Sequence, residues 1–275
     1  MIGKLIKYEF RSLWRRFLPL WAGLAALGLV NGFTITHVLE NNRIEGLSNF
    51  LLGVLPLIIL SVLFTVLGVL TLVFICQRFY QGLLGREGYL MFTLPVSSAE
   101  HILAKTIAAL LLTVLTGLAF LLSGTLLVLA LDVKGFLEGV RDAFAALRQL
   151  ELPRGIGWLI TEGLVCGLVT AASSLLQIYA AIALGHLASR HRAGWSLLAY
   201  VGISMILSTG VFQLGSLGMG RAMERWLDRI LDGGVNGAMS AMAAGMGFMI
   251  LINLALAVVF FFLTKIILDK KLNLE

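Results

Sequence analysis

The run "FLLGVLPLIILSVLFTVLGVLTLVFIC", residues 50–76, decides the fold class, because none of its residues is charged. A helix needs about 20 consecutive apolar residues to cross the hydrocarbon core of a bilayer. Inside hydrocarbon the backbone must satisfy its own hydrogen bonds, which an uninterrupted apolar run does as a helix. The alternation of apolar and polar residues that is typical of membrane barrels is absent. We therefore predict a membrane-spanning helix here.

Five other stretches also lack Asp, Glu, Lys and Arg over a spanning length. The chain is 59% hydrophobic and 13% charged, with a mean hydropathy of +0.95, whereas a soluble domain is typically about 25% charged. We predict an all-α integral membrane protein that forms one domain over residues 1–275. Its six spans are expected at about 17–39, 50–76, 106–131, 163–185, 194–217 and 238–264.

The charges between the spans predict the orientation. With six spans, both termini lie on the same side, and that side carries thirteen basic residues against five acidic ones. The opposite side carries eight basic residues against ten acidic ones. Basic loops stay in the cytoplasm, so we expect cytoplasmic N and C termini in a multi-pass protein of a plasma membrane. The net charge of +6 then reflects topology, and we expect no nucleic-acid partner.

Three segments outside the spans have helical amphipathic patterns. Residues 1–16 place apolar side chains on one face and basic ones on the other, which predicts a helix lying in the inner membrane interface. Two segments on the outer side, 132–160 and 218–237, each contain a helical apolar stripe flanked by charges. We expect short external helices there, although both segments could also be plain connectors.

Motifs for chemistry within this chain are missing. The sequence holds no HExxH, no GxSxG and no GxxxxGK[ST], so it cannot bind ATP through a P-loop of its own. Its four histidines have no metal-ligand spacing, and Cys76 and Cys166 fall at different depths of the membrane. Glu162 borders a span, and otherwise the predicted spans hold no Asp, Glu, Lys or Arg, which argues against ion coupling. We expect no cofactor, no metal and no enzymatic activity in the chain.

The connection between the second and third spans is the most distinctive part of the chain. It reads "QRFYQGLLGREGYLMFTLPVSSAEHILAK", residues 77–105. Ser97 and Glu100 form a capping box directly before the third span, and Pro95 separates the preceding chain from that helix. Gly85 and Gly88 flank a charge pair. We predict a rigid cytoplasmic projection with a polar tip, rather than a loop that follows the headgroup surface.

With these motifs the chain resembles the ABC-2-type permease subunits of bacterial ATP-binding-cassette exporters. The resemblance rests on "IKYEFRSLWRRFLPLW" at the start and "FYQGLLGREGYLMFTLPVSSAEHILAK" after the second span. It implies a dimer with a second permease chain, identical or related, and two copies of a separate ATPase subunit that bind ATP and Mg. Residues 1–16 would be the elbow helix, represented by Lys7, Tyr8, Glu9, Phe10 and Arg11.

The resemblance also implies contact and pathway residues. The 77–105 connection would be the coupling region seated on the ATPase, with its tip at Arg86, Glu87, Gly88 and Tyr89. A second contact would come from Arg190 and His191. The substrate pathway, between the second and fifth spans, would be lined by Thr65, Leu67, Phe74, Met205, Ser208 and Phe212. An uncharged interior favours an amphipathic or apolar substrate, such as a lipid, a drug or an antimicrobial peptide.

Two alternatives need no ATPase. The chain could be a membrane-embedded enzyme or assembly factor acting on lipids, with Gln177, Tyr179 and Asn253 at its site. It could also be an immunity or scaffold protein that only binds a partner. The sequence does not separate a homodimer from a heterodimer, or export from extraction out of the outer leaflet.

Overall fold

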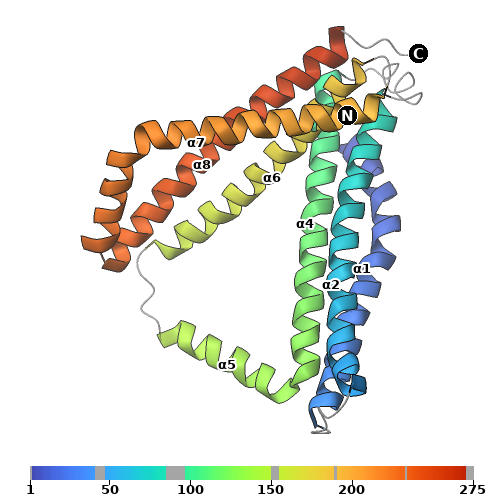
Figure 1. Ribbon diagram of the computed structural model, residues 1–275, viewed down its shortest axis with the longest axis vertical. Coiled ribbons are helices and arrows are strands. Elements are labelled where there is room, and N and C mark those ends of the chain that lie inside the picture. Colours follow the sequence, from blue (N-terminus) through green and yellow to red (C-terminus); the bar gives the residue numbers. More distant parts are fainter. Residues whose placement is uncertain are drawn as a thin grey trace. The chain divides into compact units, whose positions relative to one another are not determined.

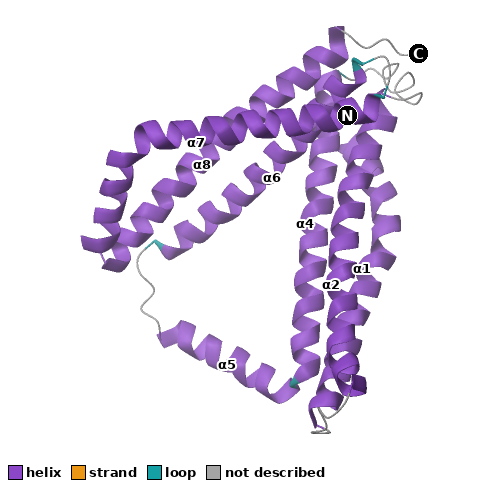
Figure 2. Cartoon of the chain, in the orientation of Figure 1, coloured by secondary structure: helices purple, strands orange, loops and turns teal. Residues whose placement is uncertain are grey.

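The computed structural model describes residues 2–40, 47–84, 97–149, 155–188, 191–232 and 234–270. Within these ranges helices dominate, and no strand occurs (Figure 2). The elements in chain order (Figure 1) are α1 (Ile2–Glu40), α2 (Leu47–Phe79), the π-helix η1 (Tyr80–Leu84), α4 (Ser98–Leu131), α5 (Val133–Gln149), α6 (Ile156–His186), α7 (Arg192–Asp232) and α8 (Gly234–Lys270). The predicted all-α fold class is confirmed for this part of the chain.

Six of these helices contain a stretch that is long and apolar enough to cross a membrane. The stretches are Leu5–His37, Val54–Leu84, Ser98–Leu131, Ile156–His186, Arg192–Gly210 and Gly234–Asp269. Each overlaps one of the six predicted spans. The agreement indicates a multi-pass membrane protein, while the side of the membrane on which the termini lie stays a prediction.

The chain divides into two compact units. Unit 1 comprises Met1–Ile2, Cys76–Leu110 and Leu152–Glu275, and unit 2 comprises Gly3–Ile75 and Leu111–Glu151. Helices α2 and α4 contribute to both units, whereas α6, α7 and α8 belong to unit 1 and α5 belongs to unit 2. The two units are described separately below.

Unit 2 is held together by close approach between α1 and α4. A Cβ added to Gly28 would lie 2.5 Å from the carbonyl oxygen of Ser123, and one added to Gly32 would lie 2.6 Å from that of Leu127. The Ser123 hydroxyl donates a hydrogen bond to the carbonyl oxygen of Leu24 at 2.9 Å. Small residues four positions apart let two membrane helices approach closely. The sequence pattern alone did not indicate this pair of glycines.

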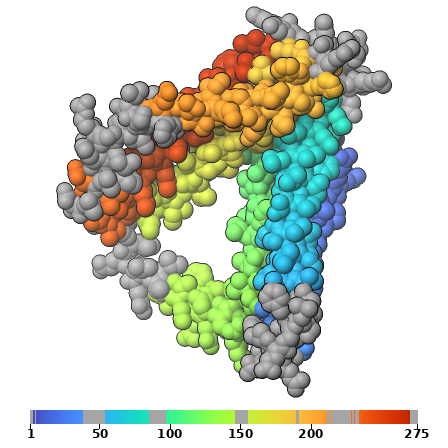
Figure 3. All heavy atoms as spheres, in the orientation of Figure 1, coloured from blue at the N-terminus to red at the C-terminus, as the bar shows by residue number. Residues whose placement is uncertain are grey.

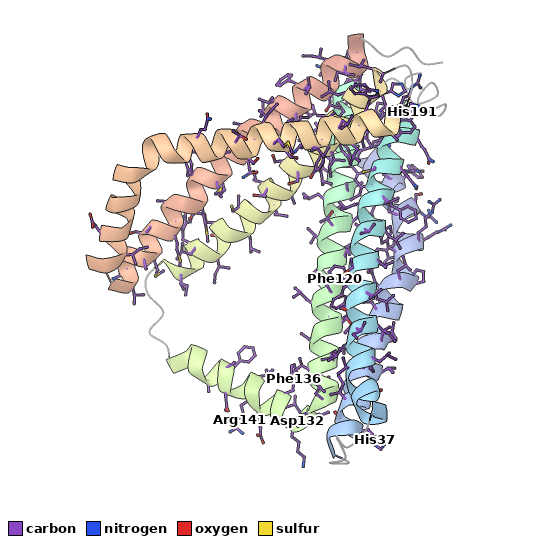
Figure 4. All side chains as sticks on the ribbon, in the orientation of Figure 1. His37, Phe120, Asp132, Phe136, Arg141 and His191 are labelled. Atoms are coloured by element: carbon purple, nitrogen blue, oxygen red, sulfur yellow. The ribbon has the colours of Figure 1, made fainter. Side chains whose placement is uncertain are left out.

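Polar and aromatic contacts also join α2 to α1 and to α4 in unit 2. Asn31 donates from Nδ2 to the carbonyl oxygen of Pro56 at 2.9 Å, which links α1 to α2. Phe64 of α2 packs on Phe120 of α4 with ring centroids 4.9 Å apart (Phe120 is labelled in Figure 4). Hydrogen bonds between membrane helices contribute modestly, on the order of 0.6 kcal/mol each, so apolar packing supplies most of the stability.

In unit 1, α6 packs against both α7 and α8. A Cβ on Gly185 of α6 would overlap the main chain of Ser196 in α7, so these helices approach closely at one end. Further along, Gln177 Nε2 donates to Ser204 Oγ at 2.8 Å. A Cβ added to Gly163 would lie 3.9 Å from the sulfur of Met246 in α8. Together these contacts make α6 the central helix of the unit.

Two predicted boundaries are not breaks in the structure. The elbow helix and the first span form one continuous helix, α1, from Ile2 to Glu40. The fifth span and the external helix after it likewise form one helix, α7, from Arg192 to Asp232, which bends along its length in Figure 1. Helix α1 continues through its junction although it contains Pro19, and α7 continues through its junction without a proline. The amphipathic patterns predict where an interfacial segment meets a membrane-spanning one, but the backbone stays helical through both junctions.

Candidate functional site

The structure builds a polar cluster in unit 1 at the base of the predicted coupling projection. We call it the Lys105 cluster, and it consists of Arg78, Phe79, Gly82, Lys105 and Tyr179. These residues come from the end of α2, from η1, from the first turns of α4 and from α6. Residues 85–96, which contain the predicted tip, lie between η1 and α4 and outside the described residues.

Lys105 is the centre of this cluster. Its side chain is only 4% exposed, although the charge count places Lys105 among the thirteen basic residues of the predicted cytoplasmic side. Its ammonium donates a hydrogen bond to the main-chain carbonyl oxygen of Arg78 at 3.1 Å. A buried charge is costly unless it is hydrogen-bonded, so this contact fixes the beginning of α4 against the end of α2.

The contact falls where α2 changes into a π-helix. Residues Tyr80–Leu84 form η1, in which Gly82, Leu83 and Leu84 are buried. A π-turn replaces the usual i to i−4 hydrogen bonds with wider ones and often marks a functional site. A Cβ on Gly82 would lie 2.5 Å from the Lys105 ammonium nitrogen, so glycine leaves the room that the lysine occupies.

Tyr179 of α6 closes the cluster from the other side. Its ring stacks on that of Phe79, with centroids 4.1 Å apart and planes 8° apart. Its hydroxyl lies 3.4 Å from the carbonyl oxygen of Lys105, a long hydrogen bond. Both rings are almost fully buried. Aromatic pairs contribute about 0.5–1.5 kcal/mol beyond the burial of their area, so three helix segments are joined at one place.

The capping box at the start of α4 is confirmed. The main-chain N–H of Ser97 donates to Glu100 Oε2 at 2.9 Å, and the Ser97 hydroxyl donates to the same oxygen at 3.1 Å. The N–H of Glu100 in turn lies 3.4 Å from Ser97 Oγ. These bonds satisfy N–H groups that the first turn of a helix leaves without partners. The chain just before residues 85–96 is therefore held in η1, and the chain just after them is held by this cap.

The second predicted contact lies near the end of α6. His191, labelled in Figure 4, is exposed and has a φ of 54°. Left-handed backbone is uncommon for residues other than glycine, but histidine is among the types enriched there. The carbonyl oxygen of His191 accepts the N–H of Trp195 at 3.1 Å and so begins α7. The neighbouring Arg190, like Arg86, Glu87, Gly88 and Tyr89, lies outside the described residues.

The elbow residues belong to unit 2. Tyr8 is 68% exposed and Lys7 and Arg11 are also exposed, while Phe10 is half-buried. Glu9 is 4% exposed and lies on the same face of α1 as the buried Leu13 and Phe17, because positions four apart share a helix face. Glu9 is thus part of the packed face, which the alternation of charges in this segment did not indicate.

The predicted pathway residues are divided between the two units. In unit 2, Leu67 is buried and Phe74 packs edge-on against Phe17 at 5.4 Å, while Thr65 is exposed. Residues two apart point in different directions on a helix, so Thr65 and Leu67 lie on different faces of α2. In unit 1, Met205 is 64% exposed and Ser208 donates to its carbonyl oxygen at 3.0 Å. The side chain of Phe212 lies outside the description.

The residues proposed for a lipid-directed enzyme are engaged in contacts within the protein. Gln177 is bonded to Ser204, and Tyr179 is buried in the Lys105 cluster. Asn253 donates from Nδ2 to the carbonyl oxygen of Met249, one turn back in its own helix, at 2.9 Å. Among the described residues, no group of three or more His, Cys, Asp or Glu side chains could hold a metal ion.

Comparison with known proteins adds no relative. Protein-family models, curated proteins and solved structures were compared with the chain, and none matches it. The function proposed next is inferred from the sequence motifs and from the geometry of the Lys105 cluster.

Proposed function

We propose that this chain is the membrane-spanning permease subunit of an ATP-driven transporter of the ABC-2 type in a bacterial plasma membrane. Two copies of a separate ATPase would bind ATP and Mg and dock on the cytoplasmic loops. A second permease chain, identical or related, would complete the pathway. The substrate would be amphipathic or hydrophobic, such as a lipid, a drug or an antimicrobial peptide.

The observation that carries this proposal is the Lys105 cluster, which joins the helices that precede and follow residues 85–96. A loop that only connects two membrane helices needs no buried lysine, no π-turn and no aromatic stack at its base. A segment that transmits force from a moving partner needs both of its ends fixed to the spans that it moves. The Lys105–Arg78 bond and the Phe79–Tyr179 stack supply that fixation. Rigid-body motion of packed helices then carries the change across the membrane.

The sequence also indicates which functions this chain and its proposed ATPase partner would each perform. The chain has spans and anchored loops but no P-loop, so energy must come from another subunit. Arg86 and Tyr89, in the predicted tip, are of the residue types that anchor interfaces. The exposed His191 next to Arg190 provides a second place for contact. Because the residues suggested for a lipid-directed enzyme are engaged in packing, we do not favour that alternative.

The test is charge reversal at the tip. In vesicles that contain the permease and its ATPase, Glu87→Arg should abolish transport-coupled ATP hydrolysis while membrane insertion stays intact. Glu138→Arg, which makes the same change on the exposed face of α5, should leave coupled hydrolysis unchanged. Unchanged coupling in the Glu87→Arg protein would overturn the contact assignment.

A further inference from the structure

Helix α5 carries the sharpest separation of apolar and charged side chains outside the spans. Phe136, Leu137, Val140 and Phe144 share one face, and Lys134, Glu138, Arg141 and Asp142 share the other, as the helical period of 3.6 residues requires. Leu137 is 58% exposed and Phe144 is 63% exposed. Large apolar side chains in a contiguous exposed stripe mark an interaction surface.

The start of α5 is fixed to the end of a spanning helix. Only Asp132 separates α4, which ends at Leu131, from α5, which begins at Val133. Asp132 Oδ1 accepts the N–H of Gly135 at 2.9 Å, and its carbonyl oxygen accepts the N–H of Phe136 at 2.9 Å. The aspartate is therefore the N-cap of α5, and these hydrogen bonds define the corner between the two helices. Because α4 spans the membrane, α5 begins at the membrane surface.

The direction of the two faces relative to α4 indicates what covers the stripe. Within unit 2, α5 leaves the end of α4 at a steep angle and does not fold back along it (Figures 1 and 3). Figure 4 shows Phe136 on the side of α5 that faces back along α4, and Arg141 on the opposite side. The apolar face thus points toward the level of the hydrocarbon, and the charged face points away from it.

The last turns of α4 also expose apolar side chains. Leu121, Leu122 and Val128, in the last turns of α4, are each at least half exposed. Such side chains on a spanning helix face lipid unless another subunit covers them. The charges of α5 nearly balance, with Lys134, Arg141 and Arg148 against Glu138 and Asp142, so attraction to anionic headgroups would add little.

From these observations we infer that α5 is an interfacial helix that lies in the plane of the membrane, with Phe136, Leu137, Val140 and Phe144 inserted between the headgroups and the acyl chains of the leaflet where α4 ends. Amphipathic helices of this kind bury their apolar face about 5–10 Å into the boundary region. The partner of this surface is lipid, and the inference does not depend on the proposed transport activity.

Site-directed spin labelling of the full chain in phosphatidylcholine vesicles tests this inference. After Cys76 and Cys166 are replaced by alanine, a single nitroxide is placed by Phe144→Cys or Asp142→Cys. A second pair, Val140→Cys and Glu138→Cys, repeats the comparison on the same helix. In each pair the two positions lie on opposite faces. Collision rates with oxygen, which enters hydrocarbon, and with a water-soluble nickel chelate then report the surroundings of each label.

The inference predicts a severalfold higher ratio of oxygen to nickel accessibility at positions 144 and 140 than at 142 and 138. High nickel accessibility at all four positions would place α5 in water and overturn the inference. Low accessibility to both reagents at 140 and 144 would show that protein, such as a second copy of the chain, covers the face, and would also overturn it. If one variant fails to fold, as judged by gel filtration, the other pair decides the question.

Discussion

The ammonium of Lys105 donates a hydrogen bond to the carbonyl oxygen of Arg78, 27 residues earlier in the chain, at 3.1 Å. This bond joins the first turns of α4 to the end of α2 just before η1, and it does so with a side chain that is only 4% exposed. The helices on either side of residues 85–96 are therefore joined to each other by this bond. The predictions below test this base and the packing around it.

Removal of the ammonium should loosen the end of α2. Lys105→Met keeps an apolar side chain of similar length but leaves the Arg78 carbonyl without this donor, and a hydrogen bond to a charged group contributes about 1.5–3 kcal/mol. We expect faster hydrogen exchange of the amides of residues 79–84 and a lower unfolding temperature in mild detergent. Lys134→Met, at an exposed position on α5, is the control. Equal exchange at residues 79–84 in both variants would contradict the role given to Lys105.

Loss of the stacked ring at position 179 should cost more than loss of its hydroxyl. Tyr179→Ala removes a buried aromatic side chain, which typically costs about 3–5 kcal/mol, whereas Tyr179→Phe keeps the stack on Phe79. Thermal unfolding should therefore rank the proteins as wild type, then Phe, then Ala. Tyr200→Ala, at an exposed site, should have little effect. If Tyr179→Phe is as unstable as Tyr179→Ala, the long hydroxyl bond rather than the stack is decisive.

An added methyl group at the contact between α1 and α4 should destabilise the protein. Gly28→Ala would place a Cβ 2.5 Å from the Ser123 carbonyl oxygen, and such overpacking typically costs about 1–3 kcal/mol. Gly23→Ala on the same helix meets nothing within 4 Å and should be neutral or stabilising by up to about 1 kcal/mol. Unfolding temperatures of the two variants should move apart, and a shift of equal size and sign in both would refute the close approach.

The capping box should contribute to the start of α4. Ser97→Ala removes the oxygen next to the Glu100 N–H and the donor to Glu100 Oε2, and loss of an N-cap costs about 1 kcal/mol. Ser98→Ala, one residue further into the helix, should be neutral, because alanine favours helix. Amide exchange of residues 98–101 should rise only in the Ser97→Ala protein. Comparable exchange in the two variants would argue against the cap.

The sequence predicted the spans and the cap because both follow from local patterns. A spanning run needs only consecutive apolar residues, and the Ser97–Glu100 spacing is itself the signal for the cap. The stripe of Phe136, Val140 and Phe144 likewise predicted a helix that the structure confirms as α5. Each of these features depends on residues within a few turns of one another.

The features that the sequence did not predict depend on distant partners. Lys105 looks like an exposed basic residue of the inner side until Arg78 is placed beside it. The burial of Glu9 and the closeness of Gly28 to Ser123 likewise depend on how helices pack. The π-turn at Tyr80–Leu84 has no local sequence signal that we recognised. The periodicity of a single helix does not show which side chains of other helices it will contact.

The central claim, that an ATPase docks on residues 85–89, is tested most directly by isolating the chain from its own membranes in mild detergent and identifying what accompanies it by mass spectrometry. We predict a P-loop ATPase in stoichiometric amount, lost when residues 85–89 are replaced by serine. It should be retained when Lys134, Glu138, Arg141 and Asp142 on α5 are replaced instead. A folded chain that carries no ATPase, or one that keeps it without residues 85–89, would contradict the claim.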